Sequence, residues 1–275
     1  MFRYFSFIIL ICIALQTRAQ EGLKTYIGSY PVTGLDECEG QAEYSYKDKP
    51  EGGRNYNGHF SLTWYNRFYL RGDFKDNKQV GTWEARWMEN YYNNMYVDNG
   101  ISTISVDFDN GLVDGKVIYR LEDPKGRPDQ SEKIECTFRQ GKFTGPLKFT
   151  VYDKGKLFLF EGEMKDNFPV GKWKETSRDF IKTNEYKIDR QRNSYIVNTI
   201  TEDVRTGDIT SETQEYISYY FPGEGKIRTN FDLLEKWEME FQLYPMAKII
   251  FILSRITMRD SERFEYALPV YLNEE

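Results

Sequence analysis

Histidine is almost absent from this chain, since His59 is the single one among 275 residues. A triad built on serine or cysteine needs a histidine base. His59 precedes Phe60 on the polar side of a predicted strand, and the chain has no Gly-x-Ser-x-Gly motif. So few histidines and cysteines also exclude a zinc cluster, and Asp107, Asp109 and Asp114 miss the calcium-loop template because the glycines are out of frame. We therefore expect no catalytic residue, no metal site and no cofactor.

Cysteine is scarce as well, with three residues in the whole chain. Cys12 lies in the N-terminal segment that we expect to be removed. Cys38 and Cys136 could pair in an oxidising compartment. Alternatively, Cys136 is a small core residue, because it precedes Phe138 by two positions on what reads as the inward face of a strand. Both interpretations remain open from the sequence.

Long apolar runs are missing beyond the N-terminus. Residues 1–19 read as a signal peptide, with Arg3 before the apolar stretch Phe5–Leu15 and cleavage after Ala19. That stretch is too short to span a bilayer, and the next most apolar run, Ile249–Leu253, has the length of a buried strand. The sequence therefore predicts a secreted or periplasmic protein without a transmembrane segment.

An excess of positive charge is also lacking. Removal of the signal peptide takes away Arg3 and Arg18 and leaves 35 basic against 43 acidic residues, a net charge of −8. Nucleic acid and anionic membrane surfaces both require a positive face. We therefore expect no nucleic-acid partner.

What the chain does contain is an internal repeat. Four times, a Phe or Met is followed three residues later by Asn or Gly, seven later by Gly and nine later by a large apolar residue. The copies start 34, 30 and 26 residues apart. They are Phe74, Asn77, Gly81, Trp83; Phe108, Gly111, Gly115, Val117; Phe138, Gly141, Gly145, Leu147; and Met164, Asn167, Gly171, Trp173. A fixed period of this kind predicts a repeat architecture.

Apolar and polar residues alternate on both sides of each copy. In the first copy, Leu70, Gly72 and Phe74 alternate with polar neighbours, and Trp83 and Trp87 resume the alternation after the glycine. A period of two predicts strands with one buried face. The four segments that join these strands have six residues each: Lys75–Val80, Asp109–Asp114, Arg139–Thr144 and Lys165–Val170.

Links this short predict antiparallel hairpins, with the Asn or Gly at positive φ in a tight turn. We expect the later glycine of each copy to let backbone or a large ring approach closely. A lone hairpin is marginal in water, so the four hairpins must lie side by side and bury a common face. Tyr56, Gly58 and Phe60 read as the first strand of a further copy, an entry strand or cap.

These residues resemble a known family. Residues 72–83, GDFKDNKQVGTW, and 162–173, GEMKDNFPVGKW, resemble the bacterial variant of the MORN repeat, over about residues 56–180. The resemblance implies an elongated, twisted antiparallel sheet of consecutive hairpins. It also implies a mostly non-catalytic family with roles in scaffolding, membrane association or protein contact. The two middle copies lack the Trp of the family pattern.

The predicted fold is therefore all-β, an elongated twisted sheet of hairpin repeats that further strands continue at the C-terminus. After the signal peptide we expect N-terminal lead and capping strands in 20–68, hairpin repeats in 69–180 and a C-terminal β region in 186–275. Strands predicted in that last region are Tyr195–Val204, Ile209–Tyr220, Lys226–Asp232, Trp237–Tyr244, Lys248–Met258 and Arg263–Tyr271.

An aromatic and amide cluster stands in the longest spacing between copies. Flat rings beside amides can stack on sugars or peptides and donate hydrogen bonds to them. Tyrosines can equally cover a thin sheet as the edge of its core. On the first reading, the binding residues are Tyr91, Tyr92, Asn93, Asn94 and Tyr96.

Three functional hypotheses follow. The first is a non-enzymatic, secreted or periplasmic binding or scaffold module for a protein or an envelope glycan. The second is a glycan-modifying enzyme that uses a pair of carboxylates on the β scaffold, although nothing among the 43 acidic residues selects a pair. The third is a purely structural role.

Overall fold

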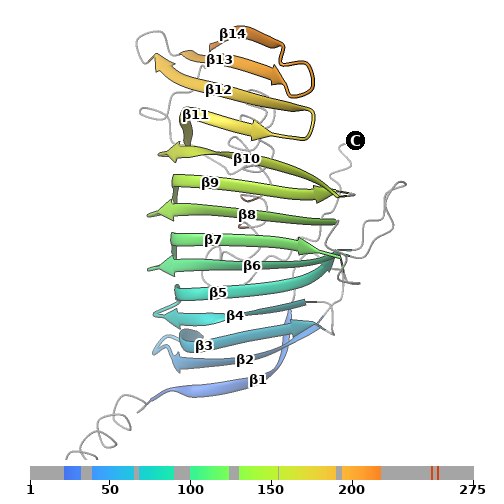
Figure 1. The fold of residues 1–275 in the computed structure, drawn as a ribbon. Helices are drawn as coiled ribbons and strands as arrows, with labels where there is room; N and C mark the ends of the chain where they lie inside the picture. The colour runs from blue at the N-terminus through green and yellow to red at the C-terminus, as the bar shows by residue number, and fades with distance from the viewer. Residues whose placement is uncertain are drawn as a thin grey trace, which may run out of the picture.

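A computed structural model describes residues 22–31, 39–64, 68–89, 100–123, 130–153, 155–189 and 194–217, together with Ile249 and Leu253. The described chain forms one antiparallel sheet of fourteen strands, which lie side by side in sequence order (Figure 1). The all-β prediction is confirmed, including the continuation of the sheet beyond the repeats. No helix in the described part is long and apolar enough to cross a membrane.

Strands of eight to twelve residues make up the sheet. In order they are β1 (Lys24–Pro31), β2 (Glu39–Asp48), β3 (Arg54–Trp64), β4 (Phe68–Lys75), β5 (Lys78–Glu89), β6 (Gly100–Asp109), β7 (Leu112–Glu122), β8 (Gln130–Arg139), β9 (Lys142–Asp153), β10 (Lys156–Lys165), β11 (Phe168–Thr176), β12 (Phe180–Asp189), β13 (Ser194–Asp203) and β14 (Ile209–Ile217).

Four hairpins turn on two residues each, fewer than the six-residue links predicted. In every case both turn residues have positive φ, from 50° to 53° at the first and from 63° to 84° at the second. This is the type I′ pattern, whose twist matches that of the flanking strands. Because the turn is so tight, the strands pair through most of each predicted link. The turn pairs are Asp76–Asn77, Asn110–Gly111, Gln140–Gly141 and Asp166–Asn167.

The later glycine of each copy serves a β-bulge. In β5, Gly81 to Trp83 lie opposite the single residue Gly72, because Arg71 pairs with Glu84 and Asp73 with Val80. Gly81 has a φ of +66°, and a Cβ there would meet nothing within 4 Å; the same holds for Gly171. The prediction that these glycines admit a close neighbour is therefore wrong at both positions, where a left-handed backbone is what requires glycine.

Gly58 occupies the same kind of bulge in β3, with a φ of +89°. Tyr44 pairs with Phe60 and Tyr46 with Tyr56, so three residues of β3 lie opposite one of β2. The prediction that this segment is a first strand is wrong, because a positive φ at the glycine marks the strand that follows a turn. β2 and β3 are thus a fifth hairpin of the series.

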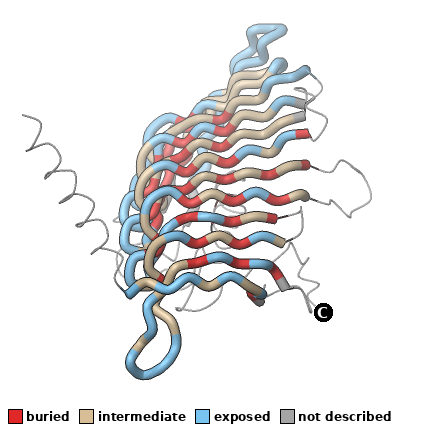
Figure 2. The backbone as a smooth tube through the Cα atoms, turned by 90° about the horizontal axis from the view of Figure 1, so that it is seen from below, coloured by how far each residue is buried: buried red, intermediate tan, exposed pale blue. Residues whose placement is uncertain are grey.

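Buried residues alternate with more exposed ones along most strands and lie on one side of the sheet, here called the core face (Figure 2). The strands curve near their two-residue turns, where the bulges lie. Trp83, Tyr119 and Trp173 are completely buried on the core face. The opposite side is called the outer face below.

Cys136 is a free thiol buried among these core residues. Burial raises its pKa far above the ordinary value of a thiol. The core interpretation of this cysteine is confirmed, while Cys38 lies outside the described residues.

The C-terminal region differs from its prediction at two positions. β13 and β14 confirm the strands expected from Tyr195 and from Ile209. Ile249 and Leu253, however, have helical backbone, so the strand predicted for Lys248–Met258 is wrong there. Both are buried in the same apolar cluster as the sheet, at 0% and 5% exposure. The other predicted C-terminal strands lie outside the described residues.

Candidate functional site

The predicted aromatic cluster, Tyr91 to Tyr96, belongs to residues 90–99 and lies outside the described residues. Its sequence neighbours on β5 and β6 are well packed. Trp87 is buried, with its ring centroid 6.2 Å from that of Tyr119, and the Tyr119 hydroxyl lies 3.0 Å from Ser102 Oγ. Trp87 therefore belongs to the core, as its alternation predicted.

The polar residues considered for catalysis or metal binding have ordinary structural places. His59 is exposed on β3 and pairs across the sheet with Asp73. Asp107 accepts hydrogen bonds from Thr82 Oγ1 at 2.8 Å and from the Lys116 amide at 3.1 Å, so its carboxylate holds a bulge. Within the described ranges, no three His, Cys, Asp or Glu side chains gather as a metal site would require.

The outer face carries ordered rows of polar side chains that run across the strands. One row passes through Glu135, Lys148, Glu161 and Lys174 on β8 to β11, so opposite charges stand next to each other at every step. A parallel row carries Arg86, Thr103, Arg120, Lys133 and Thr150 on β5 to β9. Oppositely charged cross-strand neighbours stabilise a sheet, and the first row is such a series.

A shallow groove of about 390 Å³ lies on the outer face of β7 to β10. Its floor includes two apolar side chains that are largely open to solvent, Tyr152 at 43% exposure and Leu157 at 46%. The lining residues are Arg120, Glu122, Ser131, Glu132, Lys133, Glu135, Lys148, Thr150, Tyr152, Leu157 and Leu159.

The groove carries charges of both signs, with three cationic side chains and, on the outer face, the carboxylates of Glu122 and Glu135. Lys133 Nζ lies 2.9 Å from Glu135 Oε1, so one pair is already partly neutralised. Donors, acceptors and one aromatic ring therefore stand together around an apolar strip. This combination suits a ligand with many hydroxyl or amide groups better than a polyanion.

Sequence reasoning missed this groove, although one signal was available. Residues 157–160, LFLF, are apolar on both faces of β10, whereas an ordinary repeat strand alternates. Phe160 is buried on the core face, and Leu157 and Leu159 point to the outer face. Apolar residues on the outer side of one strand mark the place where the groove forms.

A second cluster lies at the N-terminal end of the sheet, where Arg54 stands among tyrosines. Its guanidinium carbon is 4.4 Å from the ring centroid of Tyr26 and 4.7 Å from that of Tyr46, and Nη1 donates to the Tyr44 hydroxyl. Burial raises the pKa of Tyr44. Since the chain's own arginine fills this aromatic cluster, it stabilises the first hairpin rather than presenting an open site.

Glu175 is an acidic residue whose pKa is raised. It lies half-buried on β11, opposite Phe160 and Lys182. Burial raises the pKa of the carboxyl, and Lys182 partly offsets the shift. A carboxyl of this kind stays protonated to higher pH than an exposed one.

No family model and no curated protein matches this chain.

Proposed function

We propose that this protein is a non-enzymatic, secreted or periplasmic binding or scaffold module, whose sheet presents its outer face to a protein or an envelope glycan. The observation that carries the proposal is the groove over β7 to β10, where Tyr152 and Leu157 are open to solvent among charges of both signs. Burying these two side chains under a ligand is favourable, and the surrounding groups can satisfy the ligand's polar atoms.

The sheet itself supports a display role. The side chains of its core face are buried, so the outer face and the edges are the surfaces left for a partner. Fourteen neighbouring strands at about 4.8 Å spacing extend over roughly 60 Å, which is long enough to hold an extended polymer or several partners. The type I′ turns and the Gly-x-Trp segments further support a relation to the bacterial MORN-repeat variants.

The first experiment is an alanine substitution in the groove. Tyr152→Ala removes the exposed ring, and the matched control Tyr69→Ala removes a tyrosine that lies on the outer face of β4, outside the groove. Binding is measured on a glycan array and by pulldown from envelope extracts. We expect Tyr152→Ala to weaken binding at least about fivefold, since a stacked ring contributes about 1–3 kcal/mol, while Tyr69→Ala leaves binding intact.

The two assays distinguish the two kinds of partner. Glycan signals that Tyr152→Ala removes assign a sugar ligand, and captured proteins that it removes assign a protein partner. Equal binding by the wild-type chain and both variants would refute a site in the groove. Substituting Tyr91, Tyr92 and Tyr96 by Ala tests the loop in the same assays.

The raised pKa of Glu175 favours one alternative, a glycan-modifying enzyme with a carboxylic acid as proton donor. If that role is correct, purified protein cleaves a polysaccharide and Glu175→Gln abolishes the turnover. Turnover that survives Glu175→Gln, or none at all with the wild-type chain, would exclude the role for this residue.

A further inference from the structure

The two edges of the sheet differ in how they are built. β1 ends at Pro31, which has no amide N–H, and contains Gly28. The Tyr26 hydroxyl also donates to the Ser29 carbonyl at 2.8 Å, so a side chain occupies an acceptor of this strand. These features make β1 a poor template for another strand.

β14 has none of these protections. It contains nine residues without Pro or Gly, and it pairs with β13 from end to end without a bulge. Residues 209–215 are all exposed, and β14 has a strand neighbour on one side only within the described ranges (Figure 1). A long, regular and exposed edge strand is a template for pairing with another chain.

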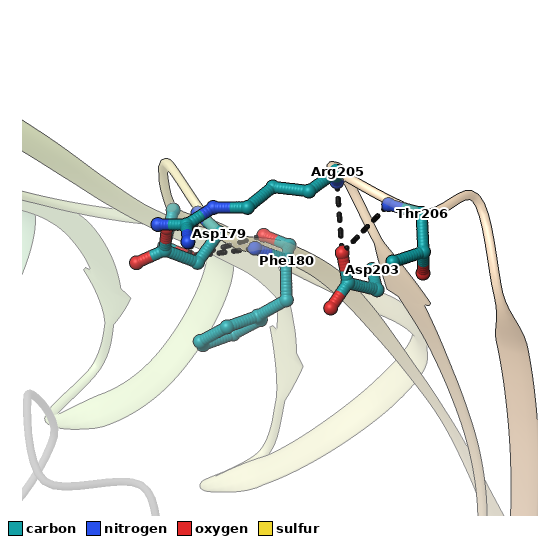
Figure 3. Close-up of polar contacts among 6 residues, drawn as sticks. Asp179, Phe180, Asp203, Arg205 and Thr206 are labelled. Atoms are coloured by element: carbon teal, nitrogen blue, oxygen red, sulfur yellow. Dashed lines mark hydrogen bonds and ion pairs between the residues drawn. The ribbon is translucent and has the colours of Figure 1, made fainter.

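The turn before β14 holds this edge in a fixed place (Figure 3). Asp203 Oδ1 accepts hydrogen bonds from the Arg205 and Thr206 amides, at 2.8 and 3.0 Å. Arg205 pairs with Asp179 in the loop between β11 and β12, and the Val204 amide donates to the Asp179 carbonyl at 3.0 Å. The edge strand is therefore presented in an ordered position, so a partner does not have to order it first.

The sequence of β14 is nearly self-complementary about Thr213. Two copies that pair antiparallel about this residue place Ile209 opposite position 217, which is also isoleucine. In the same register Ser211 stands opposite Glu215, Glu212 opposite Gln214, and Thr213 opposite itself. No carboxylate faces a carboxylate directly, which antiparallel pairing would penalise.

Two exposed isoleucines lie near the N-terminal end of β14, one on this strand and one on β13. Ile209 is 68% exposed, and Ile200 on β13, also on the outer face, is 50% exposed. Large apolar side chains that open on a sheet edge gain stability when a second strand covers them. Both the backbone and the side chains thus favour occupation of this edge.

We propose that two copies of this chain associate through β14, antiparallel about a two-fold axis at Thr213, and form one continuous sheet. This arrangement is closed, because it uses the same strand on both subunits and leaves the blunted β1 edges at the outer ends. It does not depend on the groove of the outer face.

Two variants test the register. Thr213→Lys places two lysines opposite each other, whereas Ser211→Lys places each lysine opposite Glu215 of the partner subunit. Both positions are exposed on β14, on the same face, and both variants add the same charge. Sedimentation equilibrium of the mature chain measures dimerisation. We expect the wild-type chain to dimerise. The dissociation constant of Thr213→Lys should be about fivefold higher than that of the wild type, and that of Ser211→Lys should be equal to it or lower.

Hydrogen exchange of the wild-type chain gives a second test of pairing through β14. The β14 amides that do not donate to β13 become protected as concentration rises through the dimerisation range, while those bonded to β13 are protected throughout. A chain that stays monomeric at about 100 μM, a concentration at which edge pairing of this size is populated, overturns the proposal. It is likewise overturned if the edge-facing amides are protected at every dilution, which means that the chain's own residues cover the edge, or if both lysine variants act alike.

Discussion

At the scale of single residues, the core space within a repeat hairpin is filled in two ways, by a large ring over a glycine or by two smaller side chains. A Cβ added to Gly72 would lie 2.2 Å from Trp83 Cδ2, and one added to Gly162 would lie 2.1 Å from Trp173 Cδ2. The two large rings therefore lie directly over glycines. In the middle copies, smaller partners share the same space: Val106 with Val117, and Cys136 with Leu147. In a copy with Trp, the ring fills the space that a Cβ would occupy, so the facing position requires glycine.

The first prediction tests this complementarity. Gly72→Val forces the Trp83 ring away from its place, and we expect it to lower the free energy of unfolding by about 3 kcal/mol. The double variant Gly72→Val with Trp83→Val copies the Val–Val pair of β6 and β7. It should lose less stability than the two single variants together, by about 1 kcal/mol or more. Urea denaturation of the four proteins measures this coupling, and additive losses would contradict it.

At the scale of elements, each hairpin is bonded to the one before it through its turn. The Asn77 amide donates to the Tyr56 carbonyl at 3.0 Å, and Asn77 Oδ1 accepts from the Tyr56 amide at 2.7 Å. Asn167 makes the same two contacts with Phe143, at 2.9 and 2.7 Å. Where the turn residue is Gly111 or Gly141, the backbone bond remains, to Gln79 or to Val113. Asn and Gly are thus alternatives that both accept positive φ, and Asn adds one bond between hairpins.

The turn between β13 and β14 gives a prediction on pH. Backbone hydrogen bonds from Thr206 and Arg205 lower the pKa of Asp203. Its stabilising effect is therefore complete above the pKa of the unfolded carboxyl and is lost as pH falls through the lower folded value. We expect the Arg205 and Thr206 amide shifts in an NMR titration to change at lower pH than in the isolated peptide 202–210. Asp203→Asn removes the transition, and equal midpoints in protein and peptide would contradict the assignment.

At the scale of the whole molecule, one side of a single-layer sheet carries completely buried aromatic residues. Phe60, Trp83 and Tyr119 are each at 0% exposure, which neighbouring strands alone do not provide. Ile249 and Leu253 belong to the same cluster, although at least thirty-one positions separate them from β14 in sequence. Ile249 and Leu253 therefore contribute to the core that the repeats form.

The third prediction measures that contribution. Ile249→Ala and Leu253→Ala should each lower the free energy of unfolding by about 2–4 kcal/mol, as truncation of a buried aliphatic residue does. The matched control Ile27→Ala removes an equally large side chain from an exposed site on β1 and should change stability by about 0.5 kcal/mol or less. Chemical denaturation gives all three values. Losses at 249 and 253 no larger than at 27 would mean that the sheet is stable without them.

The predictions succeeded where the signal is local. Positions of the four turns, the alternation about Trp83 and Trp173 and the inward place of Cys136 all follow from residues within about ten positions of each other. The length of the turns and the bulges at Gly58 and Gly81 were missed, because a glycine at positive φ and one under a ring look alike in sequence. The groove on β7 to β10 was missed because its lining comes from four strands, each of which looks ordinary apart from the LFLF run of β10.

The sequence alone determined the strand type, the hairpin repeat and the face that is buried, because alternation with period two and turn residues at fixed spacing act within each hairpin. Tertiary structure alone decided which side chains share the outer groove, that Ile249 and Leu253 reach the core as helical residues, and that β1 and β14 lie at the two ends of the described sheet. These features depend on contacts between residues far apart in the chain, and a local pattern of apolar and polar residues carries no information on which distant segment completes a surface.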